Sequence, residues 1–447
     1  MSGLKPAGRA LVRETFAGLR KREPGYEEGE EWLAEWTPSG GAFGLANRRL
    51  RRFETCLRSE LHRLPETPRT KRFRAALHKD ARIAPLIGQL VGTPTNATLL
   101  EEDSFERSLT WYVARACEGF GFDPEAFDRA YGEWLAEYTA KTRRVRFLAM
   151  LHPLTFGGCL DLGHGILIDQ LTDDEVSDCL KMGAIESVFA GTGKAMILSR
   201  TAVRIEWNEP HGLHDEFVDD DRAVAFDSET DARETAERVV EALRVYRPGG
   251  VAVHGTLTVR GDGSLQGGPV KAARPRGTTM SLDARQARRF ADFWPSYLNA
   301  GKQKAVGFAL RRFAFAGERS RSDDAIVDLV AALEGLLLSD NPRAGEFQFR
   351  TSVRGAQFTK HRGYSRQQVY GQLKRAYTVR SQVAHGKTPT KTDLRGANDE
   401  PLDLDAFVAE IESLARATMK DAVDRIASGN GWPPDWDRLM LGRVSLD

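Results

Sequence analysis

The sequence has few cysteines and no long apolar run. Its 447 residues include four cysteines, at positions 56, 117, 159 and 179, and none belongs to a Cys-x-x-Cys pair or to a recognised zinc-ligand spacing. Disulfide frameworks and zinc ribbons depend on such spacings, so we expect reduced thiols and no bound metal. No stretch of about eighteen apolar residues occurs, and the N-terminus lacks the apolar core of a signal peptide. We therefore expect a cytoplasmic protein without a membrane segment.

The sequence also lacks a complete phosphate-binding P-loop. The run Gly191-Thr-Gly-Lys194 resembles the end of that motif. The motif requires Gly at the position of Val188 and Ser or Thr at the position of Ala195. This run is therefore excluded as a backbone cradle for nucleotide phosphates, and we expect no cofactor.

Net charge is small, at +1, but the charges are segregated along the chain. Residues 48–82 contain twelve Lys or Arg and four acids, a net charge of +8. Residues 206–241 contain three bases and thirteen acids, a net of −10, and residues 343–395 contain twelve bases and two acids, a net of +10. Clustered Lys and Arg attract nucleic-acid phosphates, so both basic blocks are candidate RNA contacts. For residues 48–82 a solvated helix face is the favoured alternative.

Apolar periodicity predicts an α+β fold that is mainly α. Residues 1–145 have helical spacing, including a basic helix from Leu45 to Leu64, and predict an α-helical N-terminal domain. Residues 146–278 contain short β-rich runs bounded by Gly and Pro, which predict a small α+β middle domain. Residues 279–429 return to helical spacing and predict an α-helical bundle. Residues 430–447 are expected to form a tail that lies on the surface or on a partner.

Two predicted helices in the last third of the chain carry ionisable residues on otherwise apolar faces. In the first helix, Ser322 is the expected N-cap, and Asp323 and Asp324 in the first turn complement the helix dipole. Glu334 falls on the apolar face of this helix, where an unpaired carboxylate is costly.

The second helix runs from a Ser-x-x-Gln capping box at Ser365 to a C-terminal Gly386. Arg380 lies within its apolar stripe, where a guanidinium needs an anion, either the Glu of the first helix or a phosphate from outside. His385 stands four residues after Ser381, so the two share a helix face, and a hydrogen bond between them would orient the imidazole.

The run Leu373–Gly386, preceded by Asp323–Glu334, resembles the HEPN superfamily, specifically its Apea-like bacterial branch. The superfamily motif is an Arg, a polar residue, three variable residues and a His. Arg380, Ser381 and His385 match this motif position by position, although active members more often carry Asn, Asp or His in place of Ser381. The resemblance covers roughly the last third of the chain and implies that residues 279–429 form a HEPN-like helical bundle.

The resemblance implies a metal-independent endoribonuclease of the kind found in toxin–antitoxin, antiviral defence and CRISPR-linked systems. In such a site the ribose 2′-OH attacks the neighbouring phosphate, leaving a 2′,3′-cyclic phosphate and a 5′-OH. His385 would act as general acid or base, and Arg380 would stabilise the developing phosphorane charge. Ser381 would orient His385 or contact the phosphate, and Glu334 would hold Arg380 in place.

The expected partner is RNA, with substrate affinity supplied by Arg350, Arg354, Lys374 and Arg375. One chain supplies a single motif His. Because family members pair two HEPN domains, we expect a homodimer through this domain with a composite site. A regulatory protein or a phage component would be the trigger, acting through the first two domains.

An alternative of a different class remains open from the residues alone. In that case the domain is a catalytically inactive HEPN module that binds RNA, a nucleotide or a protein partner. Arg380 and Glu334 would then be a buried ion pair that fixes the register of two helices. His385 would interact only with the C-terminal dipole of its helix.

Overall fold

The computed structural model describes residues 3–22, 30–39, 42–51, 57, 66–91, 98–140, 142–184, 196–197, 200–210, 221–260, 265–270, 279–340, 345–359 and 363–441. Within these ranges the chain is mainly helical with a smaller antiparallel sheet, which agrees with the predicted α+β, mainly α class. None of the described helices is both long and apolar enough to cross a membrane.

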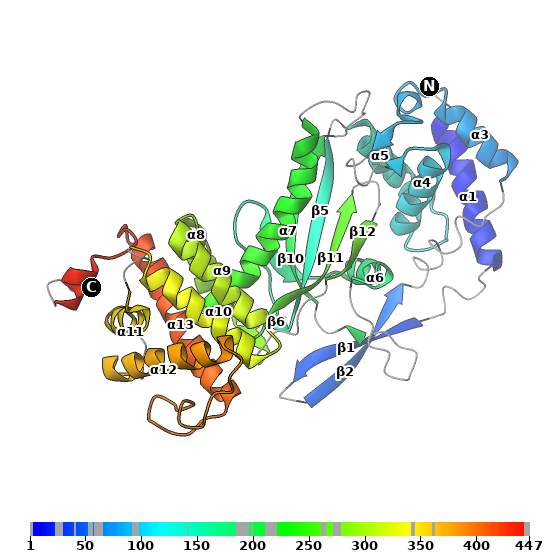
Figure 1. Cartoon of the computed structure of the whole chain (residues 1–447). Helices are drawn as coiled ribbons and strands as arrows, with labels where there is room; N and C mark the ends of the chain where they lie inside the picture. The colour runs from blue at the N-terminus through cyan, green and yellow to red at the C-terminus, as the bar shows by residue number, and fades with distance from the viewer. Residues whose placement is uncertain are drawn as a thin grey trace.

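The N-terminal end of the molecule is built largely from helices (Figure 1). They are α1 (Leu4–Arg22), α3 (Pro68–Leu77), α4 (Glu102–Ala116) and α5 (Pro124–Thr139). Asp123 caps α5 by accepting hydrogen bonds from two backbone N–H groups, and Pro124 occupies the first turn, as the sequence predicts. Their apolar faces enclose an aromatic core of their own, in which the Trp134 indole donates to Ser108 Oγ.

The prediction of a basic helix from Leu45 to Leu64 is wrong for its first residues, which form a strand. The N-terminal segment is therefore not purely helical. Strand β2 (Ala42–Arg51) pairs antiparallel along its whole length with strand β1 (Glu30–Ser39). In the sequence Gly40-Gly41 separates the two strands, a spacing typical of a two-residue hairpin. Pairing with a partner strand overrides helical propensity and is invisible in helical periodicity. Apart from Leu57, residues 52–64 lie outside the described residues.

An antiparallel six-stranded sheet occupies the middle of the molecule. Its strand order is β12 (Leu265–Pro269), β11 (Ala252–Arg260), β5 (Thr142–His152), β10 (Thr201–Pro210), β8 (Ile166–Gln170) and β7 (Leu160–Asp161). Two parallel pairings lie outside it, between β1 and β9 (Met196–Ile197) and between β6 (Leu154–Phe156) and β13 (Met280–Leu282). The short β-rich runs of the middle segment are therefore strands, as predicted.

The central strand β5 is buried on both faces of the sheet. Because successive side chains of a strand point to opposite faces, Phe147 and Leu151 join the core that contains α7 (Asp221–Tyr246). Leu148 and Met150 join the smaller core that contains α6 (Asp173–Lys181). One helix therefore covers each face.

A buried ion pair joins α6 to the sheet. The Glu175 carboxylate accepts hydrogen bonds from two guanidinium nitrogens of Arg204 on β10 and from one of Arg146 on β5. Thr172 and Glu175 also exchange side-chain-to-backbone hydrogen bonds, a capping box for α6. Burial opposes the charged form of Glu175, but the hydrogen bonds from Arg204 and Thr172 hold the pKa of its carboxyl below the usual range.

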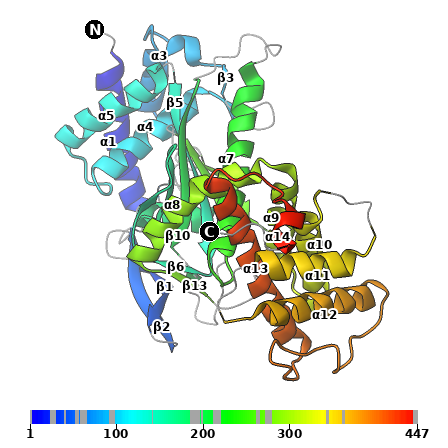
Figure 2. The ribbon, with the colours of Figure 1, turned by 90° about the vertical axis from the view of Figure 1, so that its left-hand side faces the viewer.

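The C-terminal part of the chain is a helical bundle. Its helices are α8 (Ala284–Gly301), α9 (Lys304–Glu318), α10 (Ser322–Leu337), α11 (Phe347–Phe358), α12 (Arg366–Ala384) and α13 (Leu404–Ala427). Helix α10 is central and contacts α9, α11, α12 and α13. Figures 1 and 2 show this bundle at the opposite end of the molecule from α1, α3, α4 and α5.

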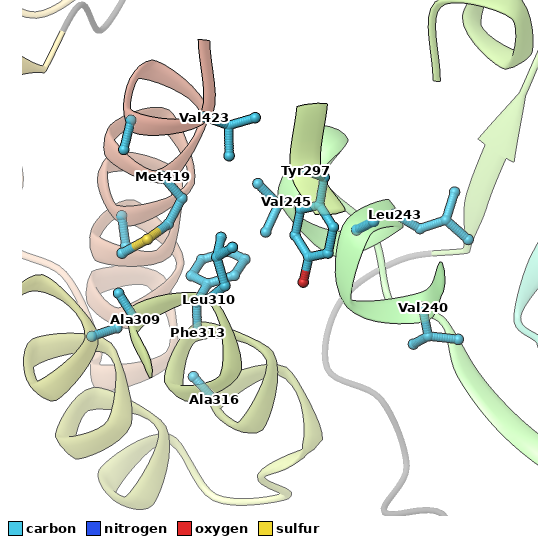
Figure 3. Close-up of a cluster of buried hydrophobic side chains, with 14 of the residues drawn as sticks. Val240, Leu243, Val245, Tyr297, Ala309, Leu310, Phe313, Ala316, Met419 and Val423 are labelled. Carbon is cyan, nitrogen blue, oxygen red and sulfur yellow. The ribbon is translucent and has the colours of Figure 1, made fainter. Parts of the chain in front are cut away.

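One hydrophobic core continues from the sheet through α7 into the bundle. Figure 3 shows part of it, where side chains from α7, α8, α9 and α13 meet. Arg244 of α7 adds polar links inside this core, because its guanidinium donates to Ala314 O of α9 and its carbonyl accepts from Arg416 Nε of α13. Residues on both sides of the predicted boundary at 278 therefore share one core.

The start of the predicted tail packs on the bundle itself. Helix α14 (Trp436–Met440) follows α13, and Trp436 is only 4% exposed. The rings of Trp432 and Trp436 lie edge-on to Phe358 of α11, with centroids 5.2 and 6.1 Å away. Residues 442–447 lie outside the described residues.

Candidate functional site

The candidate site lies where α10 and α12 pack together. Helix α10 begins one residue earlier than predicted, because Arg321 is its N-cap and Ser322 is already helical. Ser322 is buried and its hydroxyl donates to the Asp405 carboxylate of α13, a distant partner that the local sequence pattern does not show. Asp323 and Asp324 occupy the first turn as predicted. Glu334 lies near the other end of α10, and its side chain is 21% exposed.

Helix α12 has the ends that the sequence predicts. Ser365 and Gln368 form the reciprocal capping box at its start. At its end the backbone N–H of Gly386 donates to Val383 O and that of Lys387 to Gln382 O, and Gly386 has a φ of +70°. These are the two hydrogen bonds of a Schellman motif, which places His385 at the C-cap.

Arg380 and Glu334 form the predicted ion pair between α12 and α10. One guanidinium nitrogen of Arg380 lies 3.6 Å from Glu334 Oε2, and the two side chains are 30% and 21% exposed. The guanidinium carbon also lies 5.7 Å from the centroid of the Tyr377 ring. Burial raises the pKa of the Glu334 carboxyl, and the charge of Arg380 opposes that rise only in part. The carboxylate therefore sits in an environment that disfavours its charge.

Arg380 retains unused hydrogen-bonding capacity. At 3.6 Å its contact with Glu334 is an ion pair too long to be a hydrogen bond. Its Nε is buried and has no hydrogen-bond partner within the described part of the chain. Buried guanidinium N–H groups are nearly always satisfied, so the Nε–H of Arg380 is an unusual donor whose need for an acceptor is unmet.

His385 and Ser381 do not form the predicted side-chain hydrogen bond. Both belong to the described residues, and the hydrogen bond that joins them runs from the His385 backbone N–H to Ser381 O at 3.2 Å. The His385 side chain is exposed at the end of α12. The imidazole is thus accessible to an incoming ligand, and Ser381 does not orient it.

Two of the four predicted RNA contacts are occupied by structural ion pairs. Arg354 is buried, donates to both oxygens of Asp340 at 2.6 and 2.9 Å, and stacks on the Trp436 ring at 4.9 Å. Arg350 is 15% exposed and lies 3.5 Å from the same Asp340. A guanidinium that is buried against a carboxylate already has an anionic partner, so Arg354 has a structural role here and its contact with RNA stays a prediction. Arg350 pairs with the same carboxylate, which limits how far its guanidinium is available to a phosphate.

The other two predicted contacts differ from each other. Arg375 donates to Gly396 O and to Asp399 Oδ1, at 3.1 and 2.9 Å, which ties α12 to the segment before α13. Lys374 is exposed, and its ammonium forms no ion pair within the described residues. Lys374 therefore stays a candidate RNA contact, while Arg375 has a structural partner.

The structure also presents cations that the sequence interpretation missed. Lys387 and Lys391 lie two and six residues after His385, are exposed, and form no ion pair within the described ranges. Their position just after the motif His, inside the basic block of residues 343–395, was the available signal.

A second missed feature is the exposed face of α9, which alternates aromatic and basic residues. Lys304, Phe308, Arg311 and Phe315 are spaced by four, three and four residues and therefore lie on one side of the helix. Phe308 and Phe315 are 38% and 42% exposed. The Phe308 ring lies against α10 so closely that a Cβ on Gly335 would be 2.5 Å from it. This exposed aromatic ring is therefore beside the residue that follows Glu334.

No protein-family model matches this chain, and no curated protein or solved structure matches it either.

Proposed function

We propose that this chain is a HEPN-type, metal-independent endoribonuclease that acts in the cytoplasm as a toxin or antiphage effector. The observation that supports it best is the buried, unpartnered Nε of Arg380, on the helix that ends at His385. A phosphate oxygen satisfies such a donor, and a guanidinium binds two phosphate oxygens at once. Glu334 lies 3.6 Å from Nη2, the terminal nitrogen on the same edge of the guanidinium as Nε.

In this proposal each residue has a distinct task in phosphodiester cleavage. Arg380 neutralises the charge that develops on the phosphorane when the ribose 2′-OH attacks. His385 removes the 2′-OH proton or returns a proton to the leaving 5′ oxygen. Ser381 lies one residue after Arg380 and contacts the phosphate, because its hydroxyl is not used to orient His385. Lys374, Lys387 and Lys391 attract the RNA backbone.

The proposed active form is a homodimer through the bundle. General acid and base steps use two proton-transfer groups, while one chain presents a single exposed His385 at the end of α12. A second copy that places its α12 end against the first supplies the other imidazole. The trigger in this proposal is a regulatory protein or a phage component.

The alternative function is an inactive HEPN module that binds RNA, a nucleotide or a protein partner. The observation that favours it is the ion pair between Arg380 and Glu334, because a guanidinium that fixes two helices performs a structural role without a substrate. The two functions differ in what His385 does. In the inactive module its replacement leaves binding nearly unchanged, whereas in the ribonuclease it abolishes cleavage.

The test is incubation of the purified chain with end-labelled single-stranded and structured RNAs in excess EDTA. The proposal predicts cleavage by the wild type that leaves 2′,3′-cyclic phosphate ends, and loss of at least about a hundredfold in rate for His385→Ala and for Arg380→Ala. The controls are Arg366→Ala, an exposed Arg on the same helix, and His78→Ala, an exposed His at the other end of the molecule. Cleavage that persists in His385→Ala would overturn the assignment.

A further inference from the structure

A second candidate site lies far from α12. It is a cavity of about 540 Å³ between the N-terminal helices and one edge of the sheet, and it is not part of the function proposed above. Its walls come from α4, α5, α6, β5, β11 and β12. Figures 1 and 2 show α4 and α5 at the end of the molecule opposite α12. Cavities of roughly 300–1,000 Å³ between packed units are the usual size and place of small-ligand sites.

Arginine dominates the polar lining of this cavity. Five arginines from four different elements line it, namely Arg115 of α4, Arg129 of α5, Arg144 and Arg146 of β5, and Arg260 of β11. Three acids also line it, Glu133, Asp174 and Asp178, so the lining has a net charge of +2, five minus three. Convergence of guanidiniums from separate elements on one cavity favours an anionic ligand.

Two of these arginines belong to the framework of the wall. Arg260 is 8% exposed and pairs with Glu229 at 3.5 Å. Arg146 donates to Glu175 at 3.0 Å and to Glu206 at 2.9 Å. They hold strands β5 and β11 and helix α6 in place.

The other three arginines have donors to offer. A guanidinium carries five N–H groups. Among the described residues, Arg115 and Arg144, 50% and 64% exposed, each use a single terminal nitrogen, on Asp174 and Glu206 respectively. Arg129 is exposed and forms no ion pair within the described residues. A ligand with several phosphate oxygens satisfies all three, because Arg binds phosphate through two parallel N–H bonds.

The cavity also has an aromatic wall. Trp111 and Tyr112 of α4 line it, and both are half-buried. The guanidinium carbon of Arg115 lies 5.6 Å from the Trp111 ring, so cation and indole form one unit on this wall. A planar heteroaromatic ring is the ligand group that stacks on such a surface.

We propose that this cavity binds a nucleoside polyphosphate. The base stacks on the Trp111 and Tyr112 wall, and the phosphates are held by Arg115, Arg129 and Arg144. Recognition is by side chains, because the described residues that line the cavity include no glycine-rich loop at the start of a helix. The site therefore differs in kind from a P-loop, which holds phosphates through backbone N–H groups.

The experiment is isothermal titration of the full-length chain with ATP, adenosine and inorganic tripolyphosphate. The expected result is one saturable ATP site per chain, with adenosine and tripolyphosphate each bound at least about tenfold more weakly, because each offers only part of the ligand. Arg129→Gln and Trp111→Leu should each weaken ATP binding about tenfold. Arg129 has no ion pair to lose, so that variant tests the site without a folding defect.

The control is Arg72→Gln, which removes one positive charge from an exposed position of α3 outside the cavity. It should bind ATP like the wild type. Four outcomes would each overturn the proposal. ATP fails to bind, tripolyphosphate binds as tightly as ATP, or the control variant binds ATP as weakly as the cavity variants. The fourth is an RNA oligomer that binds this wall while ATP does not. The titration is independent of RNA cleavage, so its outcome does not depend on the proposed ribonuclease activity.

Discussion

The Arg380 guanidinium of α12 lies 3.6 Å from the Glu334 carboxylate of α10, and it opposes only part of the rise in the pKa of that carboxyl caused by burial. The pair therefore does two things at once. It links two helices of the bundle, and the charge of Arg380 favours the ionised form of a carboxyl whose burial favours the protonated acid. Replacement of Arg380 by an uncharged residue should therefore make the stability of the chain depend on pH through Glu334.

Arg380→Gln should destabilise the chain by about 1 kcal/mol at neutral pH, because Glu334 loses its counter-charge. An acid whose pKa is raised on folding favours the folded state below its unfolded pKa, and that contribution is lost as pH rises through the folded pKa. The loss of unfolding free energy caused by Arg380→Gln should therefore become smaller as pH falls toward the ordinary pKa of a Glu carboxyl. Urea unfolding at a series of pH values measures this. In a Glu334→Gln background the titrating group is absent, so the difference in unfolding free energy between Glu334→Gln and the double variant Glu334→Gln/Arg380→Gln should not change with pH.

Glu175→Gln should also cost less stability in acid than at neutral pH, but for a different reason. The pKa of Glu175 is held below its usual range, so its contribution to stability is present above the unfolded pKa and is lost as pH falls through the folded pKa. At neutral pH the variant should lose about 3 kcal/mol, because Arg204, 10% exposed, is left without its carboxylate. The difference in unfolding free energy between the wild type and Glu175→Gln should become smaller in acid. Glu125→Gln, an exposed change on α5, should stay within about 0.5 kcal/mol of the wild type.

The ends of the helices could be predicted from the sequence because their causes are local. Ser365 and Gln368 lie three residues apart and cap each other, and Asp283 and Gln286 do the same at the start of α8. In these cases the pattern itself contains both partners. The ion pair of Arg380 with Glu334 is different, because its partners lie on separate helices, and the sequence offered it as one of two anions for Arg380, the other being a phosphate.

The errors arise where the partner is distant in the chain. Ser322 was predicted to be an N-cap, but its hydroxyl donates to the Asp405 carboxylate, 83 residues away. Arg354 was predicted to be a free cation, but it contacts Asp340 and Trp436. Helical spacing was predicted to continue through residues 45–51, but these residues belong to strand β2, which pairs with β1. Periodicity describes one segment at a time and does not contain these contacts.

Phe308→Leu should weaken binding of single-stranded RNA while leaving duplex RNA unaffected, an expectation that depends on the proposed function. Phe308 is exposed and lies against Gly335, next to Glu334, so an unstacked base can rest on its ring. Stacking on an aromatic side chain contributes about 1–3 kcal/mol per base. Leu retains much of the contact with Gly335, which separates loss of stacking from loss of packing.

Binding for this prediction is measured by fluorescence anisotropy in the His385→Ala background, so that cleavage does not consume the probe. Phe349→Leu is the matched control, because Phe349 is 54% exposed on α11 and does not lie against α10 at Gly335. Equal affinities for Phe308→Leu and its control would contradict a stacking role for Phe308.

Trp436→Ala should destabilise the bundle by about 3 kcal/mol, although Trp436 belongs to the segment after the last long helix. Its ring is 4% exposed, lies against Phe358 and Trp432, and receives the Arg354 guanidinium on its face. Truncation leaves a cavity and removes this cation–π contact, and buried Trp-to-Ala changes cost about 3–5 kcal/mol. Urea unfolding and limited proteolysis near residue 430 measure the effect. Leu441→Ala, at a site 71% exposed, should change stability by less than about 0.5 kcal/mol. If both variants unfold like the wild type, α14 does not stabilise the bundle, and Arg354 is held by Asp340 and the Leu337 carbonyl without Trp436.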